Sequence, residues 1–261
     1  MSRGGAGNAA GMPELRPAVA RGRWCRGGIQ ATEAFSRGGT IDRDWMGRGP
    51  MRVLSRQDWA PGATRDDGRV ANMERLLVVI EGVLDVDCGA PGRQRVGAGG
   101  ALWLGAGHGM ESRLGNASPA AALRLLECWL QPERVNAAPA MAALGPDARG
   151  DVDVVVDAGG ATGAGSWWTV AAGDGGRDTL PLRLQGRVLS ARIAPGGGGA
   201  LPAGQCRRYW LEVLEGTVSA GGQRLGAGDG LGWLAGSAGA PASLRASGTG
   251  AAWLLLFELP A

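Results

Sequence analysis

The chain has 261 residues, 44% of them hydrophobic, and its 27 basic residues, all arginine, exceed 24 acidic residues by a net charge of +3. That length can bury one large β core or two smaller ones. No segment approaches the roughly 18 consecutive apolar residues of a membrane-spanning helix, and the arginines are scattered rather than massed. We therefore expect a cytoplasmic protein, monomeric, with no membrane and no nucleic acid among its partners.

The N-terminus and the cysteines carry little specific chemistry. Residues 1–13 are rich in Gly and Ala, without a continuous apolar stretch, and are expected to form a disordered tail. The four cysteines lie far apart with no CxxC pair, so neither a zinc site nor a disulfide framework is predicted. They are Cys25, Cys88, Cys128 and Cys206.

Short apolar runs separated by Gly-containing turns dominate the rest of the chain, and helical periodicity is scarce. Strand-length runs with turns about every 8–12 residues are typical of an all-β sandwich or barrel. The predicted strands lie within 75–87, 100–107, 122–132, 152–159, 187–195, 207–221, 231–236 and 251–261.

Tryptophan is the main aromatic residue, with ten copies beside two Phe and one Tyr. In the adjacent pair Trp167 and Trp168, a strand would point the two side chains to opposite faces. We expect one to enter the second core and the other to pack between domains. The tryptophans expected to pack the barrels are Trp103, Trp129, Trp210, Trp233 and Trp253.

An internal repeat is the strongest signal in the sequence. LVVIEGVLDV (77–86) is echoed by LEVLEGTVSA (211–220), and each copy precedes a Gly-rich turn and a strand that contains Trp. In both copies the EG dipeptide places Gly where a tight turn needs a positive φ. The order resembles one cupin barrel written twice, which predicts two tandem cupin barrels, also called double-stranded β-helices or jelly rolls.

The segment between the two copies predicts the domain boundaries. Residues 131–150 hold three prolines and few strand formers. We expect an N-terminal cupin over 14–135, a linker over 136–150 and a C-terminal cupin over 151–261.

Six short motifs, in matching order and spacing, resemble the pirin family, most closely its bacterial two-cupin members, some of which have quercetin 2,3-dioxygenase activity. The resemblance covers about residues 14–261. The motifs are Trp45–Gly47 leading into Met51–Leu54, Asn72–Glu74 followed by Val79–Gly82, Gly105–Gly107, Trp129–Pro132, Asp147–Arg149 and Leu255–Pro260.

The resemblance implies a metal, commonly iron, held in the first barrel by three His and one Glu, from an HxH and an HxE motif. Such a set converges on a cation and leaves positions open for substrate and dioxygen. Here the HxH positions fall on Gly68 and Val70, and the HxE positions on Ser112 and Leu114. The chain has one histidine in total, so a three-His site is impossible under any alignment, and no metal cofactor is expected.

A shifted alignment offers another set of ligands near the barrel mouth. Carboxylates with one His can hold iron or manganese in principle, although charges in GATRDDGR are also typical of a solvated loop. The residues concerned are Asp66, Asp67, Glu74, His108 and Glu111.

Three side chains are candidates for acid or base chemistry. His108 reads either as a loop imidazole at the rim or as a general base facing a cavity. Glu111, one residue before a vacated ligand position, reaches the cavity or faces water. Glu74 is kept either for a hydrogen bond in the barrel wall or as an acid or base.

Three functions stay open at this stage. The vacated positions predict a barrel interior more apolar than that of the family, which favours a small hydrophobic or aromatic ligand, or a protein partner, in a non-metal role. A metal-free enzyme acting on an apolar molecule is the second hypothesis. A quercetin 2,3-dioxygenase-like oxygenase is the third, implied by the resemblance alone.

Overall fold

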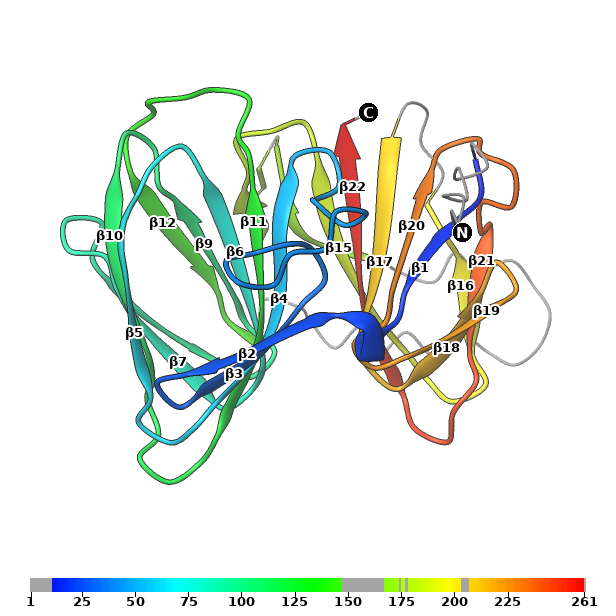
Figure 1. Ribbon diagram of the computed structural model, residues 1–261, viewed down its shortest axis with the longest axis horizontal. Helices are drawn as coiled ribbons and strands as arrows, with labels where there is room; N and C mark the ends of the chain where they lie inside the picture. The colour runs from blue at the N-terminus through cyan, green and yellow to red at the C-terminus, as the bar shows by residue number, and fades with distance from the viewer. Residues whose placement is uncertain (1–10, 147–166, 174, 177, 203–206, 261) are drawn as a thin grey trace, which may run out of the picture.

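The computed structural model describes residues 11–146, 167–173, 175–176, 178–202 and 207–260, and the regular elements assigned there are β-strands apart from one 3₁₀ turn, η1 (Ala18–Ala20). Strands pair into two 7-stranded and two 4-stranded sheets. Each large sheet closes with one small sheet into a barrel, and the large sheets lie back to back (Figure 1). The prediction of an all-β fold is confirmed. The predicted strand over 152–159 and the tail over 1–10 lie outside the described residues.

The first barrel has the strand orders β12-β9-β6-β11-β4-β3-β2 and β5-β10-β7-β8. Its strands are β2 (Gly22–Arg26), β3 (Ile29–Glu33), β4 (Met51–Trp59), β5 (Thr64–Val70), β6 (Glu74–Glu81), β7 (Val83–Asp87), β8 (Arg93–Gly97), β9 (Ala101–Gly105), β10 (Met110–Asn116), β11 (Leu123–Leu130) and β12 (Ala140–Leu144).

The second barrel repeats this topology, with the orders β1-β20-β17-β22-β15-β13-β14 and β16-β21-β18-β19. Its strands are β1 (Glu14–Arg16), β13 (Trp168–Ala172), β14 (Leu180–Pro181), β15 (Arg187–Ile193), β16 (Gly198–Ala200), β17 (Arg207–Glu215), β18 (Thr217–Ala220), β19 (Gln223–Gly226), β20 (Gly230–Leu234), β21 (Ser243–Ala246) and β22 (Ala252–Pro260).

The two EG turns of the sequence repeat occupy equivalent places, between β6 and β7 and between β17 and β18. Gly82 has φ +82° and Gly216 φ +77°. A Cβ would lie 2.5 Å from the Ala122 carbonyl oxygen at the first and 2.6 Å from that of Ala251 at the second. Both turns therefore require glycine, and the prediction of a repeated hairpin unit is confirmed.

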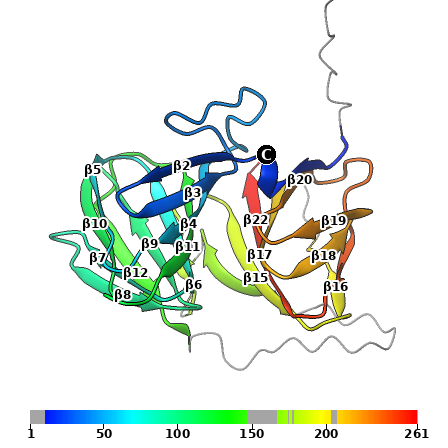
Figure 2. The ribbon, with the colours of Figure 1, turned by 60° about the horizontal axis from the view of Figure 1, so that its bottom comes forward.

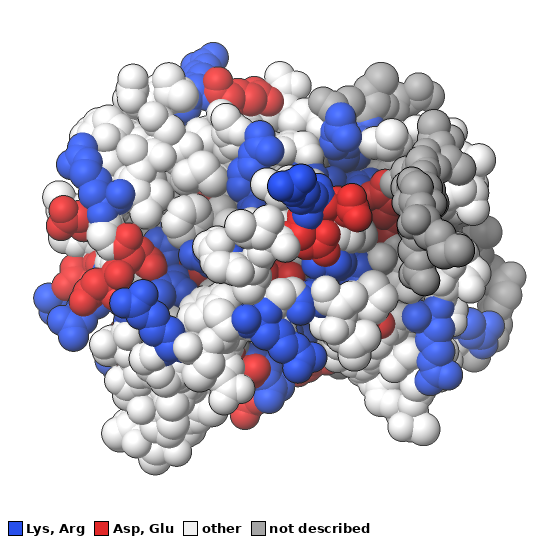
Figure 3. All heavy atoms as spheres, viewed as in Figure 1, with Lys and Arg blue, Asp and Glu red and all other residues white. Residues whose placement is uncertain are grey.

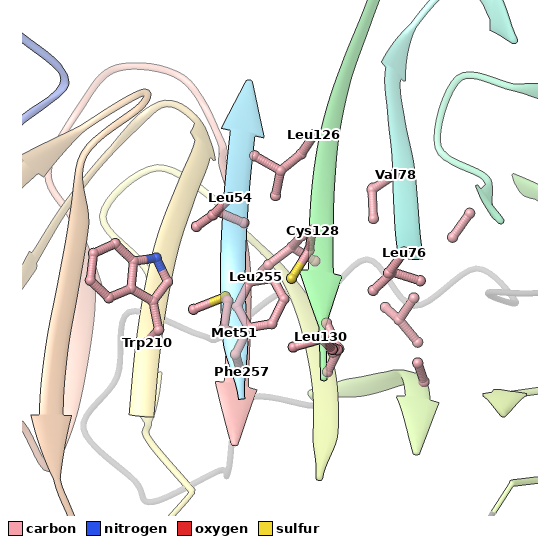
Figure 4. Packing of buried hydrophobic residues seen from close by; sticks show 14 of the residues in the cluster. Met51, Leu54, Leu76, Val78, Leu126, Cys128, Leu130, Trp210, Leu255 and Phe257 are labelled. Carbon is pink, nitrogen blue, oxygen red and sulfur yellow. The ribbon is translucent and has the colours of Figure 1, made fainter. Parts of the chain in front are cut away.

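Three apolar clusters stabilise the layers. One fills each barrel, and the third lies between the large sheets, where Met51, Leu54 and Cys128 of the first barrel meet Trp210 and Phe257 of the second (Figure 4). Central strands such as β6 and β22 are buried on both faces, because one face points into the barrel and the other toward the second barrel. That double burial explains their continuous apolar sequences.

The tryptophans follow this plan. Trp168 packs against the cluster between the barrels and Trp167 against the second barrel's core, as expected for neighbours on opposite faces of an extended chain. Four of the five strand tryptophans are buried, whereas Trp129 is half-buried. No helix among the described residues is long and apolar enough to span a membrane.

The structure places two short strands differently from the expected domain boundaries, which assigned residues 14–135 to the first barrel and 136–150 to a linker. β1 pairs with β20 in the second barrel, and β12, inside the segment expected to be a linker, pairs with β9 in the first. The two strands hold equivalent edge positions. Figures 1 and 2 show the N-terminal segment, in dark blue, passing from the second barrel across to β2 and β3 of the first.

Candidate functional site

A cluster of charged side chains fills part of the first barrel. Along β6, Leu77 and Val79 belong to the core inside the barrel, and Leu76 and Val78 to the cluster between the barrels. Alternation along the strand therefore points Arg75 inward. In β11 the same alternation places Glu127 on the inward face, beside Leu125. A guanidinium and a carboxylate therefore meet inside this barrel, beside its apolar core.

Arg75 lies at the centre of the cluster. Its Nε and Nη2 donate to Oε1 of Glu127 at 3.0 and 2.6 Å, Nη2 also donates to Asp67 Oδ2 at 2.7 Å, and Nη1 donates to Ser112 Oγ at 2.9 Å. The Arg75 side chain is 2% exposed and that of Glu127 0%. Charge-assisted, multidentate contacts of this kind are the strongest hydrogen bonds in proteins.

A second arginine completes the arrangement. Arg65 Nη2 donates to Glu127 Oε2 at 3.0 Å, Nη1 donates to Gln57 Oε1 at 2.9 Å, and Nε lies 2.6 Å from Asp67 Oδ1. The Gln57 amide in turn donates to Glu127 Oε2 at 2.7 Å. Two guanidiniums thus alternate with two carboxylates, so the buried charges are paired as burial demands.

The electrostatics of Glu127 follow from these partners. Burial by itself would raise the pKa of this carboxyl, but the Arg65, Arg75 and Arg37 guanidiniums outweigh that effect and hold its pKa well below the usual value. Glu127 is therefore an anion at neutral pH. At the edge of the cluster, burial raises the pKa of Glu33 despite a hydrogen bond from Trp24.

A β-bulge shapes the wall beside Arg75. Between β5 and β10 the register pairs Glu111 with Arg69 and Arg113 with Asp66, so Ser112 faces both Asp67 and Gly68. Gly68 has φ +65°, a conformation that a residue with a side chain rarely adopts. This bulge turns Asp67 toward Arg75 and leaves Gly68 exposed.

The four positions that the pirin resemblance assigns to metal ligands do not fit a divalent cation. Gly68 has no side chain and Leu114 is buried in the barrel core. Val70 is half-buried opposite Met110. The Ser112 hydroxyl already accepts a hydrogen bond from Arg75, and a divalent cation beside that guanidinium would meet like charge in a water-poor interior.

The shifted set of ligands is also divided by the structure. Asp67 points inward and is bound by arginines, whereas Asp66 is exposed, 3.8 Å from Arg113. Glu74 lies on the opposite face of the wall, accepting from Trp103 Nε1 at 2.5 Å and from the Arg183 backbone at 3.3 Å. Among the described residues no group of three or more His, Cys, Asp or Glu side chains is arranged to hold a metal ion.

An open pocket of about 850 Å³ lies at the mouth of the first barrel. It brings together four of the predicted site residues, Gly68, His108, Glu111 and Ser112, while Glu74, Val70 and Leu114 do not line it. His108 and Glu111 are exposed, and Ser112 joins the pocket to the arginine cluster. Cys88 also lines the pocket, and burial raises the pKa of its thiol to about 11, which keeps it protonated and unreactive.

Sequence reasoning missed Arg75, Glu127 and Arg65. A signal was present, because Glu127 interrupts the apolar run LRLLECWL and Arg75 opens the run RLLVVI. A charge in the middle of a doubly buried strand requires an opposite charge nearby, so these two residues are partners that the pattern could have suggested.

Known proteins match both the fold and the sequence. A family model described as the quercetinase C-terminal cupin domain matches residues 169–259. The crystal structure of YhhW from Escherichia coli superimposes with a TM-score of 0.80 at 22% identity, covering 95% of this chain and 98% of that one. Quercetin 2,3-dioxygenase from Acinetobacter baumannii gives a TM-score of 0.70 at 14% identity, covering 95% and 88%. The chain is a tandem cupin protein.

Sequence similarity narrows the class. A pirin-like protein from Caulobacter vibrioides is 27% identical over 222 residues, which is 85% of this chain and 90% of the relative. YhhW, described as a bacterial pirin, has also been crystallised in complex with nickel(II), and that structure has a TM-score of 0.78 with this chain at 22% identity, covering 95% of this chain and 99% of that one. In fold and in sequence, this chain is therefore similar to pirin-like bicupins.

Proposed function

We propose that this tandem cupin protein acts without a metal ion, and that it binds a small molecule at the mouth of its first barrel. The observation that carries the proposal is the Arg75 guanidinium, held by Asp67, Ser112 and Glu127. It supplies a fixed positive charge beside Ser112, one of the positions from which the family is expected to hold its cation. A built-in cation and a divalent metal ion at one place are mutually exclusive.

The pocket lining supports a ligand with both apolar and polar parts. Ala90, Pro91, Met110 and Pro139 offer apolar contact, while ionisable groups lie around the rim. Pockets of this kind commonly bind a hydrophobic or aromatic body through apolar contacts and orient it through a few polar groups. A small aromatic molecule with polar substituents fits this description, with a protein partner as the alternative occupant.

One observation favours a second function, metal-free catalysis. His108 and Glu111 line the same open pocket, so an imidazole and a carboxylate could both reach one bound molecule as acid and base. This second function uses the same pocket as the first, and the two differ in whether the bound molecule is converted to a product.

The metal question is tested by elemental analysis of the purified protein before and after incubation with Fe(II), Ni(II) or Mn(II) and desalting. YhhW, crystallised with nickel(II), is the positive control. We expect far less than one equivalent of metal and no oxygen-dependent loss of quercetin with any of the ions. Stoichiometric retained metal, or quercetin turnover that follows metal content, would refute the proposal.

The ligand question is tested with quercetin as an aromatic probe, by native mass spectrometry and thermal unfolding. Pro91→Arg would narrow the pocket, and Pro61→Arg, at an exposed turn outside it, is the matched control. We expect binding to the unsubstituted protein and the control, weakened by Pro91→Arg. Equal binding of quercetin by all three proteins would show that it does not bind in the pocket at the mouth of the first barrel and would refute that part of the proposal.

A further inference from the structure

A second cleft, unrelated to the mouth of the first barrel, is lined by arginine. It has a volume of about 580 Å³ and lies where the chain leaving β11 meets the loop between β14 and β15 and the start of β17. Four arginines line it, Arg134, Arg183, Arg187 and Arg207, against one carboxylate, Glu133. An excess of guanidinium in a concave surface requires an explanation, because like charges repel one another there.

Part of that charge is neutralised within the protein. Arg187 donates through Nε to Glu258 Oε2 at 2.8 Å, and its Nη2 lies 2.6 Å from the same oxygen. Arg183 Nε lies 3.9 Å from Glu74 Oε1. Glu133 accepts a hydrogen bond from the backbone of Gln185 at 2.8 Å. The hydrogen bond to Glu133 comes from a neutral group, so this carboxylate keeps its charge and offsets one of the arginines in the cleft.

The remaining charge has no internal counterpart. Arg207 donates through Nη1 to the carbonyl oxygen of Gln185, a neutral acceptor. Arg134 is exposed, and within the part of the chain that the structure describes neither Arg134 nor Arg207 forms an ion pair with a carboxylate. Two guanidiniums that are not paired therefore line one cleft with a single unpaired carboxylate, Glu133, so positive charge is in excess there.

Arg183 adds a fixed positive charge to the wall of the cleft. Its guanidinium lies 5.1 Å from the ring centroid of Trp103, and its Nη2 donates to the Ala138 carbonyl oxygen at 2.6 Å. These contacts immobilise the side chain. Its Nη1 is buried without a hydrogen-bond acceptor among the described residues. Because Nη1 has no accessible surface, Arg183 acts on a molecule in the cleft through its charge rather than through this donor.

From this arrangement we propose that the cleft binds a small oxyanion, a phosphate or carboxylate group of a metabolite. The planar guanidinium presents parallel N–H groups that match the oxygens of phosphate and carboxylate. Arg134 and Arg207 supply the guanidiniums that have no carboxylate partner, and Arg183 adds a positive charge already held in place.

Inorganic phosphate and citrate are the probes, added at constant ionic strength with chloride as the reference, and binding is measured by calorimetry and thermal unfolding. The variants are Arg134→Gln, Arg207→Gln and the double variant, with Arg224→Gln, exposed on β19, as the matched control. Unfolding without ligand checks that each variant is folded.

We expect saturable binding of at least one probe to the unsubstituted protein and to Arg224→Gln. Each single variant should weaken it by roughly 10- to 100-fold, as loss of a hydrogen bond to a charged group implies. The stronger probe identifies the ligand as phosphate or carboxylate. Stabilisation no greater than with chloride, or equal binding by the double variant, would overturn the proposal.

Discussion

Replacement of Arg75 by methionine tests the charged interior of the first barrel most directly. The substitution keeps an unbranched apolar stem but removes the guanidinium, so Asp67 and Glu127 each lose a hydrogen bond shorter than 2.8 Å. Breaking a fully buried ion pair by removing one partner costs about 3–5 kcal/mol. At ~2–4 °C per kcal/mol for a protein of this size, the Arg75→Met variant should melt roughly 6–20 °C lower.

The matched control is Arg95→Met. Arg95 and Asp85 form an ion pair of similar length, 2.6 Å, but the Arg95 side chain is 69% exposed. Water and salt screen such a pair, so we expect no resolvable change in the melting temperature. The two substitutions differ in burial rather than in contact distance, which isolates the effect of the interior.

Urea denaturation of both variants, with circular dichroism as the probe, measures the difference. Adding Glu127→Gln to Arg75→Met should recover part of the loss, because it removes a buried charge that has lost one of its partners. An Arg75→Met variant as stable as Arg95→Met would refute our account of the cluster. It would then follow that Arg65 and Arg37 suffice to neutralise the interior.

Three further predictions concern pH, backbone and the N-terminal segment. The pKa of Glu127 is lowered in the folded protein. The stabilisation that its charge provides is therefore fully present above the ordinary Glu pKa of about 4.3 and is lost as pH falls toward the folded value. In urea denaturation the protein should be more stable than Glu127→Gln at neutral pH, and this difference should shrink in acid; a difference independent of pH would contradict the lowered pKa. Gly82→Ala should destabilise the protein more than Gly62→Ala. Both glycines have positive φ, but only at Gly82 would a Cβ approach a carbonyl oxygen, at 2.5 Å. Equal stability of the two variants in urea would show that the backbone around Gly82 moves to make room for the Cβ. Arg21→Met should lower the free energy of unfolding by about 3–5 kcal/mol, because it leaves Glu212, bonded at 2.7 and 2.8 Å, buried without its arginine. Adding Glu212→Leu to Arg21→Met should restore most of that stability. A double variant as unstable as Arg21→Met would count against the pairing.

The repeated barrel could be predicted because its signals are local. An EG turn requires glycine at one position, and strands alternate with turns over short distances, so each signal lies within a few neighbouring residues. The pairing of β1 with β20 could not be predicted, since nothing in the three residues ELR identifies a partner near the other end of the chain.

The site was harder to predict, for a different reason. In β6 and β11 both faces are buried, so hydrophobic periodicity does not distinguish the barrel interior from the surface between barrels. Without that distinction, Arg75 and Glu127 could not be assigned to the same space. The bulge at Gly68 also changes which residue of β5 faces inward. As a result Asp67 lies inside the barrel, next to Gly68, the position that the family motif assigns to a metal ligand.

The edge strand β1 changes how the chain divides into units. The first barrel is continuous from β2 to β12, whereas the second consists of β1 together with β13 to β22. The first barrel is therefore an insertion within a discontinuous second barrel. Its strands can pair as the ribosome releases them, while β1, which precedes them all, stays unpaired until β20 is complete.

Such a delay exposes a strand edge during synthesis and raises the contact order of the second barrel, which slows its folding. A circular permutant that begins between the barrels and joins Pro260 to Glu14 through a short linker would make the second barrel contiguous. Its chain would present β1 directly after β22, when the rest of that sheet is already made. The natural order instead makes completion of the second barrel depend on a strand that precedes the whole first barrel.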